Sequence, residues 1–537
     1  MEFLKVIVKD VLYVSKITGT QNKKILIATS VLFSQLVVFT DVFLIGLFAY
    51  LIADQKTNIE IVDSIAAYFG ENKILILFVV LFRFVWLFFQ SYILRKIEFT
   101  VTKNLKEFIL SHIFEKRTYS VSDAFYYTND ISGHIGYFYS NFAAFLNNTL
   151  SIFAYCIYLV SSNFEVLSIF GVGLLCLYFP IKKIIKITRD YVNKTFFAAR
   201  DSMSEIERVI ENLFLIKILK KEKAELNKFS ETLSLLNSFQ LNKHNFQILN
   251  GYLPSFVTLV ILSVVIIFFS GIKLTLDFIG VTLKLFTSVS AVTVTFSNII
   301  NSHVHISKFK ELKFDSKDEY RKNFVLKDVD FVKFDNVVFK YENSIENIFE
   351  GLDLKFEKGK HTILTGENGT GKSTLLGLVA GIYYPQKGKV ITYSNKFGYV
   401  SAQPYIFRDT LLNNIMYGNE DLEISNETIL DMLKEFNTFK NESEYALDRD
   451  VSNKSLSSGQ MQKIGFIRSL LSNPDIILLD ESTSNLDTDS KNIVFEKLKN
   501  SKSTVINSTH DPKNFDFVDH HYEIRIVEEN RKVNKLF

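Results

Sequence analysis

Residues Gly366 to Thr374 read "GENGTGKST", a set of residue types whose order suits the binding of a phosphate. The stretch follows the strand-like "HTIL" and opens the helix-like "LLGLVAG", which is the context that a phosphate-binding loop requires. Its three glycines let consecutive backbone N–H groups turn toward a phosphate, Lys372 would reach the β- and γ-phosphate oxygens, and Ser373 would ligate Mg²⁺. A glycine-rich turn without a ligand is the alternative. The loop residues that we assign to ATP are Gly366, Asn368, Gly369, Thr370, Gly371, Lys372, Ser373 and Thr374.

A second candidate lies where the apolar run Ile476 to Leu479 ends in Asp480 and Glu481. Carboxylates at the tip of a buried strand need a partner. Asp480 is the natural Mg²⁺ ligand of a phosphate-loop site, and Glu481 is then placed to polarise the attacking water as a general base. The alternative is that both residues cap a helix beginning at "STSNLD". Beside a phosphate-binding loop, we favour the catalytic interpretation.

The composition indicates that part of the chain lies in lipid. With 47% hydrophobic residues and 51 Phe in 537 residues, it is more apolar and aromatic than a typical soluble protein. Six apolar runs precede residue 305, and crossing a hydrocarbon layer takes about 20 helical residues. A single run such as "FRFVWLFFQ" is also compatible with a core helix of a soluble domain, but six runs favour membrane spans. The predicted spans are Ile25–Ala53, Ile74–Leu94, Phe142–Val160, Val166–Ile185, Leu249–Ser270 and Phe278–Ile300.

Loop charge predicts the orientation of these spans. Five Lys or Arg residues precede the first span, six lie between Arg95 and Asn141, and thirteen lie between Ile181 and Gln247. The other three loops hold only Lys56, Lys73 and Lys273. By the positive-inside tendency, both ends of the chain and the two long loops face the cytoplasm. We expect an integral membrane protein, of the bacterial plasma (inner) membrane, with a cytoplasmic ATPase domain.

The pattern changes at "SKFKELKFDSKDEYRKNF", which is charged and lacks apolar periodicity. Beyond it, short β-like runs alternate with helical stretches, as in a mostly parallel α/β sheet. We therefore predict a six-span α-helical membrane domain over residues 1–306, a linker over 307–324, and an α/β P-loop ATPase domain over 325–537.

The stretch "SLSSGQ", which begins at Ser455, carries the link to a known family. Together with the phosphate loop and the two carboxylates, it resembles the ATP-binding cassette superfamily, and six spans before one cassette resemble its exporter half-transporters. In that family Leu456 to Gln460 would be the signature motif, which completes the ATP site of a second cassette. The resemblance implies that Ser457, Gly459 and Gln460 act on a partner's nucleotide, so that the chain works as a dimer. We expect a homodimer, and a heterodimer remains open.

Four further positions match the order of the family's motifs. Tyr341 resembles the aromatic residue that stacks on adenine, with ordinary strand packing as the alternative. Gln403, in "SAQPYIF", resembles the Q-loop residue that links Mg²⁺ and the attacking water to the membrane-domain contact. Asp487, in "SNLD", resembles the D-loop residue that couples the two sites. His510 resembles the switch histidine that contacts the γ-phosphate, although a lone His is more often structural.

The chain also departs from the family. Ser458 stands where Gly is usual, which adds a side chain near the nucleotide and predicts reduced activity at worst. The preceding "DRDVSNKS" lacks the Glu and Gly of the exporter cross-linking loop. Because Glu481 is present, the sequence shows no sign of an inactive hydrolytic site.

Three charged residues lie within the predicted spans, namely Asp41, Arg83 and Lys284. A charge there costs about 2.5 to 3.5 kcal/mol on insertion scales, so each should face protein or a wet cavity. Helix–helix pairing is one interpretation for Asp41 and Arg83, and snorkelling toward the surface is one for Lys284. Contact with a transported substrate is the other. If Arg83 and Lys284 line the cavity, an anionic amphiphile would fit, as in lipid and lipid-linked glycan flippases.

These observations predict an ATP-hydrolysing exporter or flippase that moves an amphipathic substrate by alternating access, with membrane lipid and the substrate as partners. The segments Tyr119–Gly133 and Glu211–Glu222 resemble the coupling segments that would transmit ATP-driven motion, with solvated amphipathic helices as the alternative. A peptide or drug exporter is the nearest competing function. A nucleotide-gated channel or regulator is the competing function of another class. The net charge of +3 gives no indication of nucleic-acid binding, and six spans exclude a soluble DNA-handling ATPase.

Overall fold

The computed structural model describes residues 2–19, 24–53, 60–115, 121–162, 164–268, 275–311, 319–341, 344, 346–512, 515, 517–527 and 530–537. The chain divides into two compact units, Met1–Asp315 and Ser316–Phe537. Each unit has hydrophobic cores of its own.

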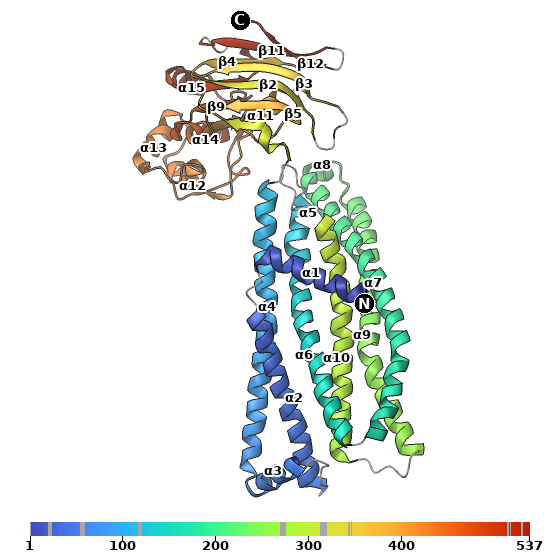
Figure 1. The fold of residues 1–537 in the computed structure, drawn as a ribbon. Coiled ribbons are helices and arrows are strands. Elements are labelled where there is room, and N and C mark those ends of the chain that lie inside the picture. Colours follow the sequence, from blue (N-terminus) through green and yellow to red (C-terminus); the bar gives the residue numbers. More distant parts are fainter. Residues whose placement is uncertain are drawn as a thin grey trace. The chain divides into compact units, whose positions relative to one another are not determined.

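The first unit is a bundle of long helices (Figure 1). The shorter α1 lies across the long helices rather than along them, and contacts α4 and α10. A π-helical segment, η2 (Tyr127–Ile131), joins α5 to α6. The helices are α1 (Glu2–Thr18), α2 (Lys24–Ala53), α3 (Glu60–Glu71), α4 (Ile74–Glu115), α5 (Val121–Tyr126), α6 (Ser132–Ser162), α7 (Phe164–Glu211), α8 (Leu213–Ile218), α9 (Glu222–Phe268) and α10 (Leu276–Glu311).

Among the described residues, five helices are long and apolar enough to cross a membrane, namely α2, α4, α6, α9 and α10. The remaining predicted span, residues 166–185, lies within α7, a helix of 48 residues. Several side chains of that segment are outside the described set. Because α4, α7 and α9 each exceed 40 residues, they continue well beyond the roughly 20 residues that a bilayer requires.

The helices of this unit pack most extensively along α6 and α10, and along α7 and α9. One close approach, between α4 and α6, depends on Gly136, because a Cβ there would lie 2.0 Å from Thr102 Oγ1. The interior also contains polar side chains, including Asp41, Asn301 and His305. Buried polar groups at membrane depth are costly, so their positions indicate where function is located.

The second unit is built on a six-stranded sheet of order β12-β11-β4-β10-β9-β6, in which only the β11–β12 pair is antiparallel. A four-stranded sheet of order β1-β5-β2-β3 and the β7–β8 pair complete the strands. The strands are β1 (Phe324–Leu326), β2 (Phe331–Phe339), β3 (Phe349–Glu357), β4 (His361–Gly366), β5 (Lys387–Thr392), β6 (Phe397–Ser401), β7 (Asp409–Thr410), β8 (Asp450–Val451), β9 (Ile476–Asp480), β10 (Thr504–Ser508), β11 (His520–Val527) and β12 (Asn530–Lys535). The helices are α11 (Lys372–Val379), α12 (Leu411–Met416), α13 (Asn426–Glu435), α14 (Ser458–Leu471) and α15 (Thr488–Asn500), with short turns η3 (Glu319–Asn323) and η4 (Glu442–Tyr445).

Four parallel strands of this sheet share one rung at or near their carboxyl ends. Leu364 of β4 pairs with Ser508 of β10, Ser508 pairs with Asp480 of β9, and Asp480 pairs with Ser401 of β6. The loops that leave these strands therefore emerge side by side at one edge. In open α/β sheets this carboxyl edge is where ligands bind.

Candidate functional site

The loop between β4 and α11 has a backbone that only glycine adopts easily. Gly369 and Gly371 have φ of +82° and +102°, and Gly366 has φ of +151°. A Cβ on Gly366 would lie 2.4 Å from the carbonyl oxygen of Ile524 on the neighbouring strand β11. Gly371 is the N-cap of α11, so the loop leads directly into a helix N-terminus, where the first N–H groups favour anions.

Lys372 is the first residue of α11, and its side chain reaches back into this loop. Its Nζ donates to the carbonyl oxygens of Gly366 at 2.7 Å and Glu367 at 3.0 Å. Burial lowers the pKa of Lys372, while the negative charges of Glu481 and Asp480 oppose that shift. The electrostatic influence of these carboxylates is consistent with the sheet register, which brings the strands β4 and β9 to one edge.

Glu481 and His510 meet at the same edge. His510 Nε2 and Glu481 Oε1 are 2.8 Å apart, and the two side chains are 47% and 39% exposed. Glu481 has φ of +52°, and its N–H donates to Ser508 O at 2.9 Å. Non-glycine residues with positive φ are uncommon and cluster at functional sites. Because both side chains are partly exposed, water can reach both groups.

Gln403 and Tyr341 flank this edge. Gln403 follows β6 and is exposed. The Tyr341 hydroxyl lies 2.7 Å from Thr374 Oγ1 of the phosphate loop. The Tyr341 ring packs edge-on against Phe339 and Tyr383. Tyr341 is thus fixed beside the loop that it is predicted to serve, and 37% of its surface remains exposed.

Ser457 and Gln460 form a capping box at the start of α14. The Ser457 hydroxyl accepts from Gln460 N–H at 3.2 Å, and Gln460 Oε1 accepts from Ser457 N–H at 2.9 Å. Gly459 packs closely on the following loop, because a Cβ there would lie 2.9 Å from Asn485 O. The signature residues thus cap the N-terminus of α14. Ser457 is exposed and Gln460 is half-buried.

Asp487 caps α15, where its Oδ1 accepts from Ser490 N–H at 2.9 Å, and it also forms an ion pair of 2.9 Å with Lys463 of α14. Burial would raise the pKa of Asp487, but the hydrogen bonds from Ser490 and Lys463 outweigh it and hold the pKa well below its usual range. Lys463 was not predicted from the sequence. Its Nζ also donates to Asn437 O, which ties the signature helix to two loops.

Gln462 is a second residue that the sequence did not reveal. It is fully buried on α14, and its amide nitrogen donates to Ala402 O at 2.8 Å. Its Oε1 accepts from Asn485 N–H at 3.0 Å. One amide therefore holds together the signature helix, the loop that carries Gln403 and the loop that leads to Asp487. In the sequence, Gln462 cannot be distinguished from an exposed glutamine on a helix.

The signature helix lies away from the phosphate loop of its own chain. Helix α14 packs against β6, and Gln462 anchors its first turns beside the end of that strand. Two strands, β10 and β9, separate β6 from β4. At about 4.8 Å per strand, β6 and β4 are roughly 14 Å apart. Among the described residues, the hydrogen bonds of Ser457 go to Gln460 of its own helix and none goes to the phosphate loop of its own chain.

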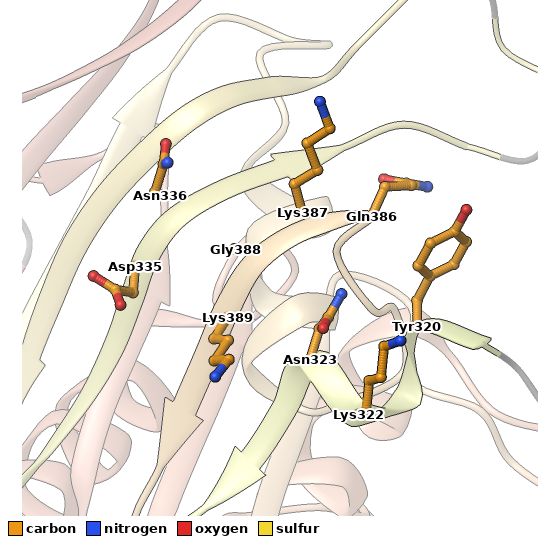
Figure 2. A pocket seen from close by; sticks show the side chains of 9 residues that line it. All are labelled: Tyr320, Lys322, Asn323, Asp335, Asn336, Gln386, Lys387, Gly388 and Lys389. Carbon is orange, nitrogen blue, oxygen red and sulfur yellow. The ribbon is translucent and has the colours of Figure 1, made fainter.

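A pocket in the second unit lies elsewhere, on the sheet that contains β2 and β5 (Figure 2). Its lysines do not converge, since Lys387 and Lys389 point in different directions in Figure 2. Gln386, at its rim, forms two hydrogen bonds with the backbone of Lys340. None of the residues that we assign to the nucleotide lines it. The lining residues are Tyr320, Lys322, Asn323, Asp335, Asn336, Gln386, Lys387, Gly388 and Lys389.

In the first unit, the three charged residues of the spans lie together. Asp41 of α2 forms ion pairs with Arg83 of α4 at 2.5 Å and with Lys284 of α10 at 3.0 Å. The Tyr155 hydroxyl of α6, which the sequence did not single out, lies 3.5 Å from Asp41 Oδ2. Lys284 thus pairs with Asp41 and does not follow the snorkelling alternative. We call these four residues the outer cluster.

Comparison with known proteins identifies the second unit. Residues 349–484 match the sequence profile of the ABC transporter family. ATP-binding cassette sub-family B member 5 of Homo sapiens is 34% identical over 196 residues, which are 33% of this chain and 15% of that protein. The ATP-dependent permease MDL1 of Candida albicans is 34% identical over 202 residues, 33% of this chain and 29% of the permease. The ATP-dependent lipid A-core flippase of Pasteurella multocida is 32% identical over 195 residues, 33% of each chain.

A solved structure extends the likeness to the whole fold. A bacterial Atm1-family ABC exporter with ATP bound matches with a TM-score of 0.72, covers 93% of both chains and shares 16% sequence identity. Residues 349–484 therefore form an ABC transporter domain, and the chain as a whole has the fold of an ABC exporter. This ABC chain has a helical membrane domain followed by an α/β ABC ATPase domain, so the predicted family and fold class are confirmed. Its matches span a third or less of the length of the three relatives named above.

Proposed function

We propose that this ABC chain is an ATP-hydrolysing exporter that acts as a dimer and moves an amphipathic, anionic substrate across a membrane. One observation carries the proposal. The register of β4, β10, β9 and β6 gathers the phosphate loop, Glu481, His510 and Gln403 at one edge, whereas Ser457 begins a helix that packs on the edge strand β6, and among the described residues it forms no hydrogen bond with the phosphate loop. A second copy would supply the missing signature residues.

Each group at this edge has a chemical role. The phosphate loop and Lys372 would bind the β- and γ-phosphates, and Tyr341 would stack on the base. Ser373, Asp480 and Gln403 offer hydroxyl, carboxylate and amide oxygens, the hard ligands that Mg²⁺ prefers, so this set fits the metal. When bound, Mg²⁺ would neutralise charge on the phosphates.

The protein's own acid–base chemistry centres on Glu481. Its carboxylate would accept a proton from the attacking water, and His510, 2.8 Å away, would hold that carboxylate in place and donate to the γ-phosphate. The partner's Ser457 and Gly459 would add donors on the opposite side of the γ-phosphate. Asp487 and Gln462 link the signature helix to the loops around the site. A movement of the signature helix when the dimer closes would therefore also move these loops.

Hydrolysis would favour one of two states of the membrane domain. The predicted coupling segment Glu211–Glu222 includes α8 and its C-cap residue Leu219, and apolar side chains are exposed here, with Phe214 80% and Leu219 56% exposed. Such residues are suited to a protein partner, which supports coupling over a solvated helix. The other predicted segment, Tyr119–Gly133, lies partly outside the described residues.

The outer cluster supports an anionic substrate. One carboxylate faces two cations, so the cluster has a net charge of +1, and Arg83 and Lys284 remain 29% and 37% exposed. A permanent excess of positive charge in an apolar region favours an anionic group. One relative, from Pasteurella multocida, is named a lipid A-core flippase, which supports a lipid as the substrate class. A peptide or drug-like substrate is the competing hypothesis.

We further propose that the partner is a second copy of the chain, with a heterodimer as the alternative, and that the ATPase domain and both termini are cytoplasmic, in a bacterial plasma (inner) membrane. The charge bias of the loops supports this orientation.

Reconstituted vesicles test the proposal. When the ATPase domain faces outward, the protein should move a headgroup-labelled anionic lipid from the outer to the inner leaflet of the vesicle, and only when ATP is present. Glu481→Gln should abolish this movement. Passive flux that persists in Glu481→Gln would instead show a channel. Mass spectrometry of molecules that co-purify with ATP-bound Glu481→Gln would identify the substrate class. Peptides or neutral drug-like compounds in place of anionic amphiphiles would overturn the substrate assignment.

A further inference from the structure

A second polar site lies in the membrane domain, along the contact between α6 and α10. We call it the inner cluster and define it as His134 and Asn141 of α6 with Asn298, Asn301 and His305 of α10. The rings of His134 and His305 stack with centroids 4.0 Å apart. Asn298 donates to Asn141 Oδ1 at 3.0 Å. The three α10 residues share one face of the helix, because their spacing is three and four residues.

Part of the inner cluster lacks the partners that buried polar groups need. Asn301 is 7% exposed, and neither its amide nitrogen nor its oxygen hydrogen-bonds to any described residue. Nδ1 of His305, a residue also 7% exposed, lacks a partner in the same part of the chain. Leaving such groups unsatisfied is destabilising, because they give up their hydrogen bonds to water and gain none in return. Leu would avoid that cost at both positions, so the polar side chains point to a partner that binds in another state.

The inner cluster is open on one side and rich in donors. His134 is exposed, and so is Tyr137, whose hydroxyl lies 3.2 Å from Asn298 Nδ2. Lys243 of α9 acts electrostatically on both imidazoles. Among the described residues, no carboxylate hydrogen-bonds or ion-pairs with Lys243 or the inner cluster. Donor groups, one cation and no anion suit an oxygen-rich headgroup that carries phosphate and hydroxyls.

The inner and outer clusters are separated by about the thickness of a membrane. Lys284 and Asn301 are on the same helix and 17 residues apart. At 1.5 Å per residue this is about 26 Å, close to the roughly 30 Å thickness of a hydrocarbon core. The two clusters therefore lie near opposite faces of the membrane. With the termini in the cytoplasm, the inner cluster lies at the cytoplasmic side.

We propose that the inner cluster is the loading site for the hydroxyl- and phosphate-bearing headgroup of a lipid substrate, and that the outer cluster receives the same headgroup near the opposite face. This inference rests on the proposed export of an anionic amphiphile and extends it to a headgroup that carries hydroxyls as well as charge. In the conformation described, the Asn301 amide is covered, so loading requires that α6 and α10 separate around it.

Native mass spectrometry of lipid binding tests this directly. Wild-type protein is titrated with phosphatidylinositol, phosphatidic acid and phosphatidylcholine in separate arms. Asn301→Leu removes the unpaired amide, and His134→Phe keeps the stacked ring but removes its hydrogen-bonding atoms. Each should weaken phosphatidylinositol binding five- to tenfold and phosphatidic acid binding about twofold or less, while Asn301→Gln should restore most of the affinity. Thr295→Val is the matched control, because within the described part of the chain Thr295 hydrogen-bonds only to its own helix backbone.

Three results would overturn the loading site. The first is a phosphatidylinositol midpoint within twofold of wild type in both variants. The second is an equal loss in Thr295→Val. The third is a wild-type protein that binds neither anionic lipid better than phosphatidylcholine. The measurement does not require hydrolysis, so Lys372→Ala protein should bind lipid normally. If the protein transports lipid with ATP while the variants bind lipid normally, the proposed loading site is wrong and the proposed function is unaffected.

Discussion

Replacing Asp41 by Asn tests the outer cluster by removing its only negative charge. Asp41 is 7% exposed and pairs with both Arg83 and Lys284. Asn keeps the shape but leaves two cations facing each other across three helices. The direction of the effect is therefore loss of stability of the membrane domain.

The magnitude follows from burial. Removing one partner of a fully buried ion pair costs about 3 to 5 kcal/mol, because an uncompensated charge remains. Arg83 and Lys284 are about one-third exposed, so solvent screening reduces that figure. We expect about 2 kcal/mol for Asp41→Asn. Arg83→Leu alone should cost less, because Lys284 still neutralises Asp41.

The assay is a double-mutant cycle by thermal or denaturant unfolding in nanodiscs, with lipid composition fixed. Asp41→Asn combined with Lys284→Met should recover at least 1 kcal/mol relative to Asp41→Asn, because one unpaired cation has been removed. Additive effects of the two substitutions would refute the pairing. A change below about 0.5 kcal/mol in Asp41→Asn would refute the magnitude.

Four further predictions concern the ATPase domain. Gly366→Ala should abolish nucleotide binding, measured with a fluorescent ATP analogue, since its Cβ would lie 2.4 Å from Ile524 O; unchanged affinity would contradict the loop geometry. Gly459→Ala should lower ATPase turnover at least tenfold with little change in ATP affinity, because its Cβ would press on Asn485 O at 2.9 Å in the loop before Asp487. Gln462→Leu should lower ATPase turnover and increase hydrogen exchange in the loop after Ser401, whereas Gln462→Glu should retain part of the contact with Asn485. Burial lowers the pKa of His361 from 6.5 to about 4, so its contribution to the free energy of unfolding is fully present above pH 6.5 and should fall by up to about 3 kcal/mol as the pH drops to 4. His361→Phe should flatten this pH dependence, measured by hydrogen exchange in the ATPase domain. An unchanged slope in His361→Phe would contradict the prediction.

Much of the ATPase domain could be predicted because its chemistry is local in sequence. The loop at Gly366 to Thr374 and the pair Asp480–Glu481 each combine a strand, a turn and reactive residues within ten positions. Parallel strands then bring such segments to one edge, but the contact between Glu481 and His510 was not predicted and came from the structure. The positive φ of Glu481 could not be read from the sequence, because it depends on the hydrogen bond to Ser508.

Residues that act through tertiary contacts were missed. Gln462 looks like any helical glutamine until the loops at Ala402 and Asn485 are placed against it. Asp41, Arg83 and Lys284 stood out because charge is rare in apolar spans, but their convergence needed the packing of three helices. The inner cluster gave a weaker signal still, since Asn and His at the end of a span are compatible with the membrane surface.

Mixed dimers offer the most direct test of the claim that each copy completes the ATP site of the other. One chain carries Lys372→Ala and the other Ser457→Arg, and the dimer is isolated through two different tags. In this dimer both defects fall in one composite site, and the other site has an intact phosphate loop and an intact signature. The account predicts ATPase activity well above that of either homodimer and approaching half of wild type. Activity no higher than in the two homodimers would contradict it.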